Sequence, residues 1–143
     1  MQLQPYLHKV QVYETDMMGI THHASYIHWL EEARIDLMEQ LGYSYQRLNE
    51  EGVASPVLGL QMDYKAPTTF PDTVRIQPRL LSFNGVILEI GYTLTRVGED
   101  TPVATAVTRH TFTDASGHIV RLKRDHRAFY DMLVQWTEEQ PDT

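Results

Sequence analysis

Residues 13–29 hold the side chains best suited to chemistry, because they place an aspartate just ahead of a long helical pattern. Asp16 and Gly19 lie in a segment with no regular hydrophobic spacing, and the helical pattern begins at about His23. The first backbone N–H groups of a helix have no acceptor within the helix, so they can bind an oxyanion. A carboxylate beside them can attack a carbonyl carbon or activate water. This stretch therefore indicates acyl-transfer chemistry.

A long helix should follow this turn, from about residue 23 to residue 41. Its apolar residues recur three or four positions apart, which is the spacing of one buried helix face. They are Ala24, Ile27, Leu30, Ala33, Leu37, Met38 and Leu41. Gly42 follows directly and is typical of a helix C-cap. A strand is expected before the turn, at residues 7–14, because Val10 and Val12 alternate with polar residues.

The remainder of the chain is rich in strand patterns separated by turns. Strands are predicted at residues 57–64, 73–83, 86–97 and 103–112, with residues 119–123 extending the pairing. Helices are predicted at residues 45–50 and 128–136, and the polar tail at residues 137–143 is expected to fray. This order indicates one α+β domain over residues 1–143, in which a five-stranded antiparallel sheet wraps a long central helix.

A sheet of five strands leaves an exposed edge and an uncovered face. Exposed edges promote pairing with another chain, and most soluble oligomers are closed and symmetric. We therefore expect a homodimer, and further pairing of dimers into a homotetramer.

Composition excludes several classes of function. The 143 residues include no cysteine, so neither a thiolate nucleophile nor a cysteine-ligated zinc site is available. Twelve basic against nineteen acidic side chains give a net charge of −7, which argues against a nucleic acid partner. No apolar run approaches the roughly 20 residues of a membrane helix, and the N-terminus lacks the features of a signal peptide. We therefore expect a cytoplasmic protein without membrane insertion.

Two sequence motifs resemble those of a known family. The first is Tyr13-x-x-Asp16-x-x-Gly19-Ile20-x-x-His23-Ala24-x-Tyr26-x-x-Trp29-x-Glu31-x-Ala33-Arg34, and the second is Asp63-Tyr64-x-Ala66-Pro67 followed by Asp72. Together they are similar to the signature of the hotdog-fold acyl-CoA thioesterases, most nearly the group of 4-hydroxybenzoyl-CoA thioesterase and its YbgC-like relatives. The order of the predicted elements agrees with that family along nearly the whole chain.

The resemblance implies a hotdog fold and an enzyme that hydrolyses an acyl-CoA to a free carboxylic acid and coenzyme A. It makes Asp16 the catalytic carboxylate, either as a nucleophile that forms a mixed anhydride or as a base for water. It makes the backbone N–H of His23 the oxyanion donor, and Gly19 permits the turn between them. It also implies a site at a dimer interface that needs no metal and no cofactor, since coenzyme A belongs to the substrate.

Other residues are candidates for contacts with the substrate. Met17 and Met18 stand where the family often has smaller or prolyl residues, which predicts an apolar and flexible acyl pocket. The residues expected at this pocket are Met17, Met18, His22, Tyr26, Tyr64 and Pro67. The densest basic cluster is a candidate for the coenzyme A phosphates, or equally for a solvated face. Its members are Arg121, Lys123 and Arg124.

Other functions stay open. Asp16 could be an ordinary turn residue, although it lies too far from His23 to cap that helix. A hotdog hydratase or dehydratase needs a histidine five residues after its aspartate, whereas His22 follows Asp16 by six. A non-catalytic acyl-CoA-binding protein is a further alternative. His22 and His23 have no third ligand at a metal-binding spacing, so no metal site is expected, and Glu31 is kept as a second candidate carboxylate.

Overall fold

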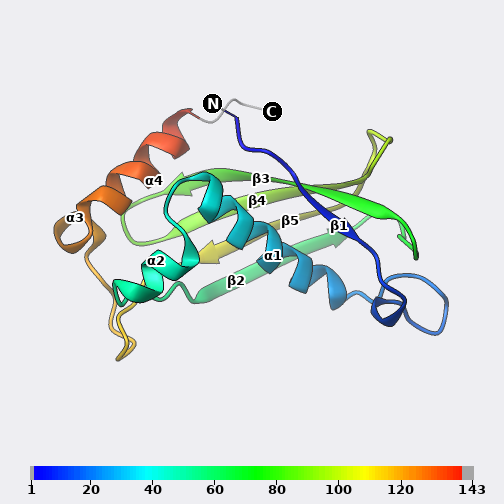
Figure 1. Cartoon of the computed structure of the whole chain (residues 1–143), viewed down its shortest axis with the longest axis horizontal. Coiled ribbons are helices and arrows are strands. Elements are labelled where there is room, and N and C mark those ends of the chain that lie inside the picture. The colour runs from blue at the N-terminus through cyan, green and yellow to red at the C-terminus, as the bar shows by residue number, and fades with distance from the viewer. Residues whose placement is uncertain (1, 140–143) are drawn as a thin grey trace.

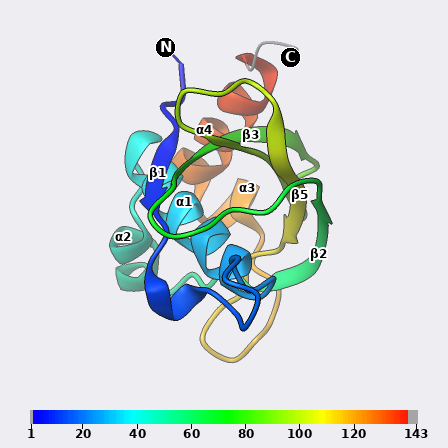
Figure 2. The ribbon, with the colours of Figure 1, turned by 90° about the vertical axis from the view of Figure 1, so that its right-hand side faces the viewer.

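The computed structural model describes residues 2–139, which form one sheet, one long helix and several short helices (Figure 1). In chain order the elements are β1 (Tyr6–Lys9), the 3-10 helix η1 (Val12–Glu14), α1 (Ser25–Gln40), α2 (Tyr45–Glu50), β2 (Val57–Tyr64), β3 (Thr73–Phe83), β4 (Leu88–Arg96), β5 (Pro102–His110), α3 (Leu122–Asp125) and α4 (Arg127–Glu139). The strand order is β1-β3-β4-β5-β2, and every neighbouring pair is antiparallel. Viewed from one end, the sheet curls round α1 (Figure 2). The predicted α+β class and the sheet that wraps a central helix are confirmed.

The core lies between α1 and the concave face of the sheet. Successive side chains of a strand point to opposite faces, so alternate residues of β3, β4 and β5 face the helix. The buried residues of these strands include Val74, Ile76, Leu80, Leu88, Ile90, Tyr92, Leu94, Ala104 and Ala106. From α1, Trp29 and Leu37 are 0% exposed. Burial of each large apolar side chain stabilises the fold by roughly 1.5–3 kcal/mol, so this core fixes the position of α1.

The buried face of α1 differs in part from the predicted one. Of the predicted residues, those buried are Leu30, Ala33, Leu37, Met38 and Leu41. Ala24 is exposed and Ile27 is 44% exposed, whereas Tyr26 and Trp29 are buried. The indole N–H of Trp29 donates to the Glu14 carboxylate (2.7 Å), which allows this large ring to be buried without an unpaired donor. Leu41 is the C-cap residue, and Gly42 directly after it has a φ of +83°, so the helix ends where this glycine predicted.

The predicted strand at residues 7–14 was too long. β1 ends at Lys9, and the backbone N–H of Gln11 donates to the Glu14 carboxylate (2.8 Å) to close the turn of η1. Val10 is 0% exposed and Val12 is 65% exposed, so these two valines do not share a face. The carboxylate offers the backbone a local partner that competes with the strand ladder, and alternation alone does not reveal this.

The other predicted strands are confirmed with small changes at their ends. β2 and β3 have the predicted bounds, and β4 and β5 are slightly shorter than predicted. Residues 119–123 do not extend the sheet, because Ile119 forms only one isolated bridge with Thr113 and α3 begins at Leu122. β2 pairs with β5 alone among the described strands, so its other edge is free for a further strand.

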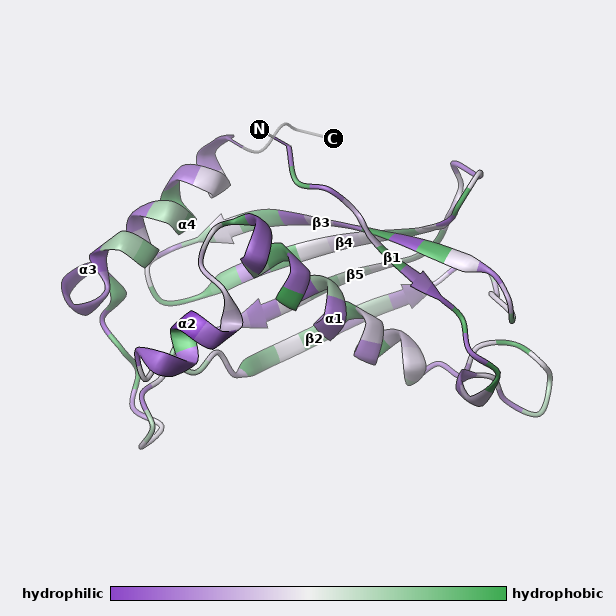
Figure 3. Ribbon diagram, in the orientation of Figure 1, coloured by the Kyte–Doolittle hydropathy of each residue, from purple (hydrophilic) through white to green (hydrophobic). Residues whose placement is uncertain are grey.

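The C-terminal helix α4 is longer than predicted and packs on the end of the core. Its buried Phe129 contacts the rings of Tyr43 (4.7 Å between centroids) and Phe112 (5.2 Å). Hydrophobic and hydrophilic bands alternate along it (Figure 3), as expected of a helix with one buried face. Residues 137–139 are helical rather than frayed, and residues 140–143 lie outside the described residues. No helix within residues 2–139 is both long and apolar enough to cross a membrane.

Candidate active site

Asp16 lies in a tight turn that its own side chain stabilises. The Asp16 Oδ1 atom accepts the backbone N–H of Met18 (2.8 Å), and the Asp16 carbonyl accepts the N–H of Gly19 (3.0 Å). The Asp16 N–H donates to the carbonyl of Ile20 (2.8 Å) and closes the loop. Gly19 has a φ of +79°, a conformation disfavoured for other residues, as expected of a glycine that permits this turn. The orientation of the half-buried Asp16 carboxylate is thus fixed.

A second turn in the chain repeats these three hydrogen bonds, and its Asp114 Oδ1 also accepts the N–H of His118 (3.0 Å). Asp114 Oδ1 accepts the N–H of Ser116 (2.9 Å), the Gly117 N–H donates to the Asp114 carbonyl (3.1 Å), and the Asp114 N–H donates to the His118 carbonyl (2.9 Å). Gly117 also has a positive φ, of +85°. Turn geometry alone therefore does not mark Asp16 as functional. The surroundings of the turn distinguish it, and the Asp114 turn supplies an internal control.

The backbone N–H of His23 is unpaired within residues 2–139. Its neighbours are engaged, because the His22 N–H donates to the Glu14 carbonyl (2.8 Å) and the Ala24 N–H donates to Nδ1 of His22 (3.0 Å). The Ser25 N–H donates to the His22 carbonyl (2.9 Å), and α1 begins there. The helix therefore starts two residues later than predicted. His23 lies in the turn that leads into it, where its N–H is available to a ligand.

Asp16 and His23 line the same pocket, which has a volume of about 400 Å³. Its other residues are Met18, Ile20, Thr21, Tyr26, Tyr64, Lys65, Ala66 and Pro67. The structure thus brings together six of the residues predicted from the sequence, namely Asp16, Met18, His23, Tyr26, Tyr64 and Pro67. Lys65 was missed as a site residue, although it lies inside the second motif. It is the one cation among the described residues of this pocket.

Two tyrosines join the end of β2 to the start of α1. The hydroxyl of Tyr64 donates to the His23 carbonyl (2.9 Å), and the rings of Tyr64 and Tyr26 meet edge to face at 5.3 Å. The Tyr26 hydroxyl is hydrogen-bonded to Thr68 Oγ1 (2.9 Å), which contacts Thr21 Oγ1 (2.6 Å). Burial, with a smaller effect of Tyr26, raises the pKa of Tyr64, so its hydroxyl remains a donor at neutral pH. These contacts fix the His23 carbonyl, which lies on the peptide that follows the one carrying the free N–H.

Several predicted substrate contacts lie outside this pocket in the single chain. Met17 is fully exposed, and the exposed His22 ring stacks on His23 at 4.3 Å. The basic cluster lies on and next to α3, at the opposite end of the molecule from the loop between η1 and α1 (Figure 1). Its members are Arg121, Lys123 and Arg124. Arg124 is also paired with Asp125 (2.8 Å). Within one chain these cations do not reach the Asp16 pocket.

A smaller pocket of about 160 Å³ lies between α1 and the strands β2, β4 and β5. Its walls include Ile27, Leu30, Glu31, Arg34, Val57 and Leu60. Its polar residues form a chain, in which Thr108 Oγ1 contacts the Tyr92 hydroxyl (2.9 Å) and Nε2 of His110 (2.8 Å). Among the described residues, Nδ1 of His110 has no hydrogen-bond partner. Burial, and then the charge of Arg34, lower the pKa of His110 to about 4, so the ring is neutral at pH 7.

This buried histidine predicts a loss of stability in acid. An unfolded histidine titrates near pH 6.5, so between pH 6.5 and about 4 the unfolded chain binds a proton that folded His110 does not. The stabilisation is complete above pH 6.5 and is lost as the pH falls through this window, by on the order of 3 kcal/mol. Urea unfolding of the wild type and His110→Gln at pH 7 and pH 4.5 measures it. The variant should lose less stability on acidification, and equal losses would contradict the prediction.

Gly19 supplies a second prediction. Alanine at this φ costs about 1–2 kcal/mol, although an added Cβ would meet no atom within 4 Å. Gly19→Ala should therefore lower the unfolding free energy by that amount and also lower kcat, because the strained turn moves the Asp16 carboxylate. Gly117→Ala introduces the same strain into the matching turn, again without a contact. It should show the stability loss without the loss of kcat, and equal kcat values for the two variants would contradict the role of the Asp16 turn.

The described residues contain no group of three histidine, aspartate or glutamate side chains that could hold a metal ion. What the site does contain is a carboxylate held in place, a free backbone N–H and an open pocket beside both. This arrangement can stabilise a developing oxyanion while an oxygen nucleophile approaches the same carbonyl carbon.

Comparison with known proteins identifies the family of this chain. The chain matches the thioesterase-like superfamily over residues 10–137, and it belongs to that superfamily. It is 36% identical over 81 residues to the acyl-CoA thioester hydrolase YbgC of Escherichia coli O6:H1, and these cover 55% of this chain and 60% of YbgC. It is 36% identical over 84 residues to YneP of Bacillus subtilis, covering 59% of this chain and 61% of YneP. The matched part thus spans about three fifths of the length of either relative.

A solved structure extends the likeness to nearly the whole chain. The DHNA-CoA thioesterase of Staphylococcus aureus superposes with a TM-score of 0.88 over 92% of this chain and 89% of that chain, at 23% sequence identity. Identity at this level supports the fold rather than the substrate. The predicted hotdog fold is thereby confirmed.

Proposed function

We propose that this protein hydrolyses an acyl-CoA thioester to a free carboxylic acid and coenzyme A, with Asp16 as the catalytic carboxylate. The observation that carries the proposal is that Asp16 lines the same pocket as His23, whose N–H is unpaired within residues 2–139. The name of the YbgC relative, an acyl-CoA thioester hydrolase, supports the same reaction and the same class of substrate.

The chemistry needs no group beyond these. The carbonyl carbon of a thioester is electrophilic, and negative charge develops on its oxygen during attack, where the His23 N–H donates a hydrogen bond. As a nucleophile, Asp16 would form a mixed anhydride and expel the coenzyme A thiolate, and water would then hydrolyse the anhydride. As a base, Asp16 would take a proton from water as that water attacks the carbonyl. Gly19 allows the turn that serves either route.

The two pockets support a place for each part of the substrate. Both the 160 Å³ pocket and the Asp16 pocket have residues of α1 and β2 in their walls, and the mainly apolar walls of the smaller one suit an acyl group. Lys65 is available to an anionic or carbonyl group of coenzyme A. Met18 borders the larger pocket and can adapt to different acyl groups.

The free edge of β2 supports a homodimer. This strand exposes Val57, Leu58 and Leu60, and its last residue, Tyr64, lines the Asp16 pocket. If two β2 strands pair antiparallel, the end of one chain that carries α3 lies beside the Asp16 pocket of its partner. The basic cluster could then reach the coenzyme A phosphates across the interface. A sedimentation-equilibrium mass equal to the monomer would contradict the dimer. Further pairing into a tetramer and location in the cytoplasm stay predictions.

Product analysis with crotonyl-CoA separates hydrolysis from the main alternatives. This substrate contains both a thioester and a double bond, so a thioesterase releases crotonate and free coenzyme A. A hydratase would instead form 3-hydroxybutyryl-CoA and leave the thioester intact. A non-catalytic binding protein would leave the substrate unchanged. We expect free thiol without hydration, and formation of the hydroxyacyl product would contradict the proposal.

A further inference from the structure

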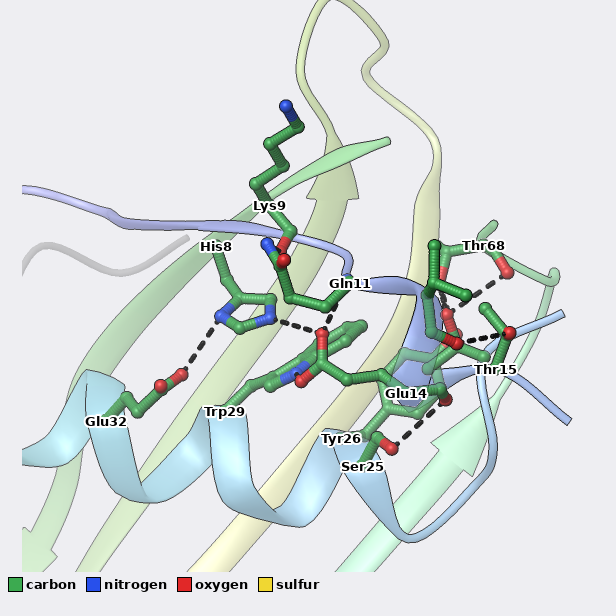
Figure 4. A network of polar contacts seen from close by, with 12 residues as sticks. His8, Lys9, Gln11, Glu14, Thr15, Ser25, Tyr26, Trp29, Glu32 and Thr68 are labelled. Carbon is green, nitrogen blue, oxygen red and sulfur yellow. Dashed lines mark hydrogen bonds and ion pairs between the residues drawn. The ribbon is translucent and has the colours of Figure 1, made fainter. Parts of the chain in front are cut away.

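Glu14 is a buried carboxylate at the junction of β1, η1 and α1, and the catalytic scheme above does not use it. It is 8% exposed, and its two carboxylate oxygens contact three donors from separate segments (Figure 4). Oε1 faces Nε2 of His8 (2.8 Å) and accepts the backbone N–H of Gln11 (2.8 Å), while Oε2 accepts the indole N–H of Trp29 (2.7 Å). Burial acts to raise the pKa of Glu14, but these hydrogen bonds together outweigh it and lower the pKa below its ordinary value.

The backbone carbonyl of Glu14 is also hydrogen-bonded, and its donors lie next to the candidate active site. Its carbonyl accepts the N–H of His22 (2.8 Å) and the hydroxyl of Ser25 (3.2 Å). Glu14 precedes Asp16 by two residues, and His22 precedes His23 by one. Glu14 thus fixes two places. One is the beginning of the turn that carries the Asp16 carboxylate, and the other is the peptide next to the free N–H of His23.

His8 completes this arrangement from β1. Its ring stacks on Trp29 (4.5 Å between centroids), and its two nitrogens face two carboxylates, with Nε2 at 2.8 Å from Glu14 and Nδ1 at 3.0 Å from Glu32. The first turns of α1 are thereby joined to β1 through Glu14, His8 and Glu32.

We propose that Glu14 is a positioning residue of the active site, whose buried carboxylate sets the distance between the Asp16 carboxylate and the His23 N–H. The side-chain contacts hold Glu14 against α1, and the carbonyl contacts transmit that position to the His22–Ser25 turn. The inference rests on the proposed thioester hydrolysis. It adds a role for a residue that touches neither substrate nor the reacting atoms.

The test is Glu14→Gln, which keeps the shape of the side chain. Glutamine has one acceptor oxygen and an NH2 group, so the NH2 must face either Trp29 or the pair of His8 and Gln11, which places donor against donor. A small displacement of reacting groups can cost up to about 100-fold in rate. We expect kcat for an acyl-CoA to fall about 10- to 100-fold while KM stays within about twofold, because the binding pocket itself is unchanged.

Glu51→Gln is the matched control. Glu51 accepts the Tyr43 hydroxyl (2.6 Å) and Nε of Arg47 (3.0 Å), so it is also the centre of a local network, but at α2 and away from the Asp16 pocket. Its substitution should lower the thermal midpoint and leave kcat unchanged. Hydrogen exchange adds a readout that does not depend on activity. Amides of residues 15–23 should exchange faster in Glu14→Gln and at the wild-type rate in Glu51→Gln.

A double variant distinguishes positioning from general loss of stability. Trp29→Phe removes the indole N–H, so the NH2 group that Glu14→Gln introduces would no longer oppose a donor there. Combining the two substitutions should raise kcat above that of Glu14→Gln alone. A kcat of Glu14→Gln within twofold of wild type, or no recovery in the double variant, would overturn the role of Glu14. A wild type that releases no thiol would contradict the proposed function itself, and is thus a separate outcome.

Discussion

Replacing His23 with proline is expected to lower kcat about 10²- to 10³-fold while the protein stays folded. Proline has no backbone N–H, so the change removes the one donor that we assign to the thioester oxygen. Loss of a single oxyanion donor costs this much in other enzymes. Proline should be tolerated because the His23 N–H has no partner within residues 2–139, and α1 begins only at Ser25. Steady-state kinetics with circular dichroism of the same sample measures both properties.

His23→Ala is the control for this result. Alanine retains the backbone N–H and removes only the exposed imidazole, which stacks on His22. We expect its kcat to stay within about threefold of wild type, an allowance far below the cost of a lost oxyanion donor. If alanine and proline at this position lower kcat equally, the side chain rather than the N–H is the important group. The oxyanion assignment would then be wrong.

Asp16→Asn should have the second large effect, a fall in kcat of about 10²- to 10⁴-fold. Asparagine keeps the side-chain oxygen that accepts the Met18 N–H, so the turn survives. What it lacks is the negative charge and the basicity that attack on the thioester or activation of water requires. Steady-state kinetics on an acyl-CoA that the wild type cleaves measures the change.

Asp114→Asn makes the same chemical change in the turn that repeats the three hydrogen bonds of the Asp16 turn. This variant therefore measures how the loss of the negative charge affects a turn of this kind that lies outside the Asp16 pocket. Its kcat should equal that of wild type. Equal falls in kcat for Asp16→Asn and Asp114→Asn would show that Asp16 acts only through the fold.

Much of the fold could be predicted from the sequence because its long elements have clear periodic patterns. β2 and β3 have the predicted bounds, and the Asp16 turn with its positive-φ Gly19 lies where the motif places it. These features depend on residues close together in the chain. For the same reason the short helix α2 was predicted with its observed bounds.

The features that were missed depend on partners distant in the chain. Glu14 is buried because His8 and Trp29 reach it from other elements, and this contact ends β1 early and turns the aromatic face of α1 inwards. The position of the basic cluster also depends on distant contacts, because α3 lies at the opposite end of the molecule from the loop between η1 and α1 (Figure 1). Lys65 lines the pocket because it directly follows β2, whose position is set by its pairing in the sheet. The spacing of basic residues along the chain does not reveal this position.

The most direct test of the central claim is the rate of free thiol release from acyl-CoA substrates, measured side by side for the wild type and Asp16→Asn. Short, long and aromatic acyl groups should all be included, because the acyl preference is open. We predict that the wild type cleaves at least one of them catalytically, with one free acid per thiol, and that the variant is at least about 100-fold slower. No thiol release by the wild type, or equal rates for the two proteins, would contradict the account.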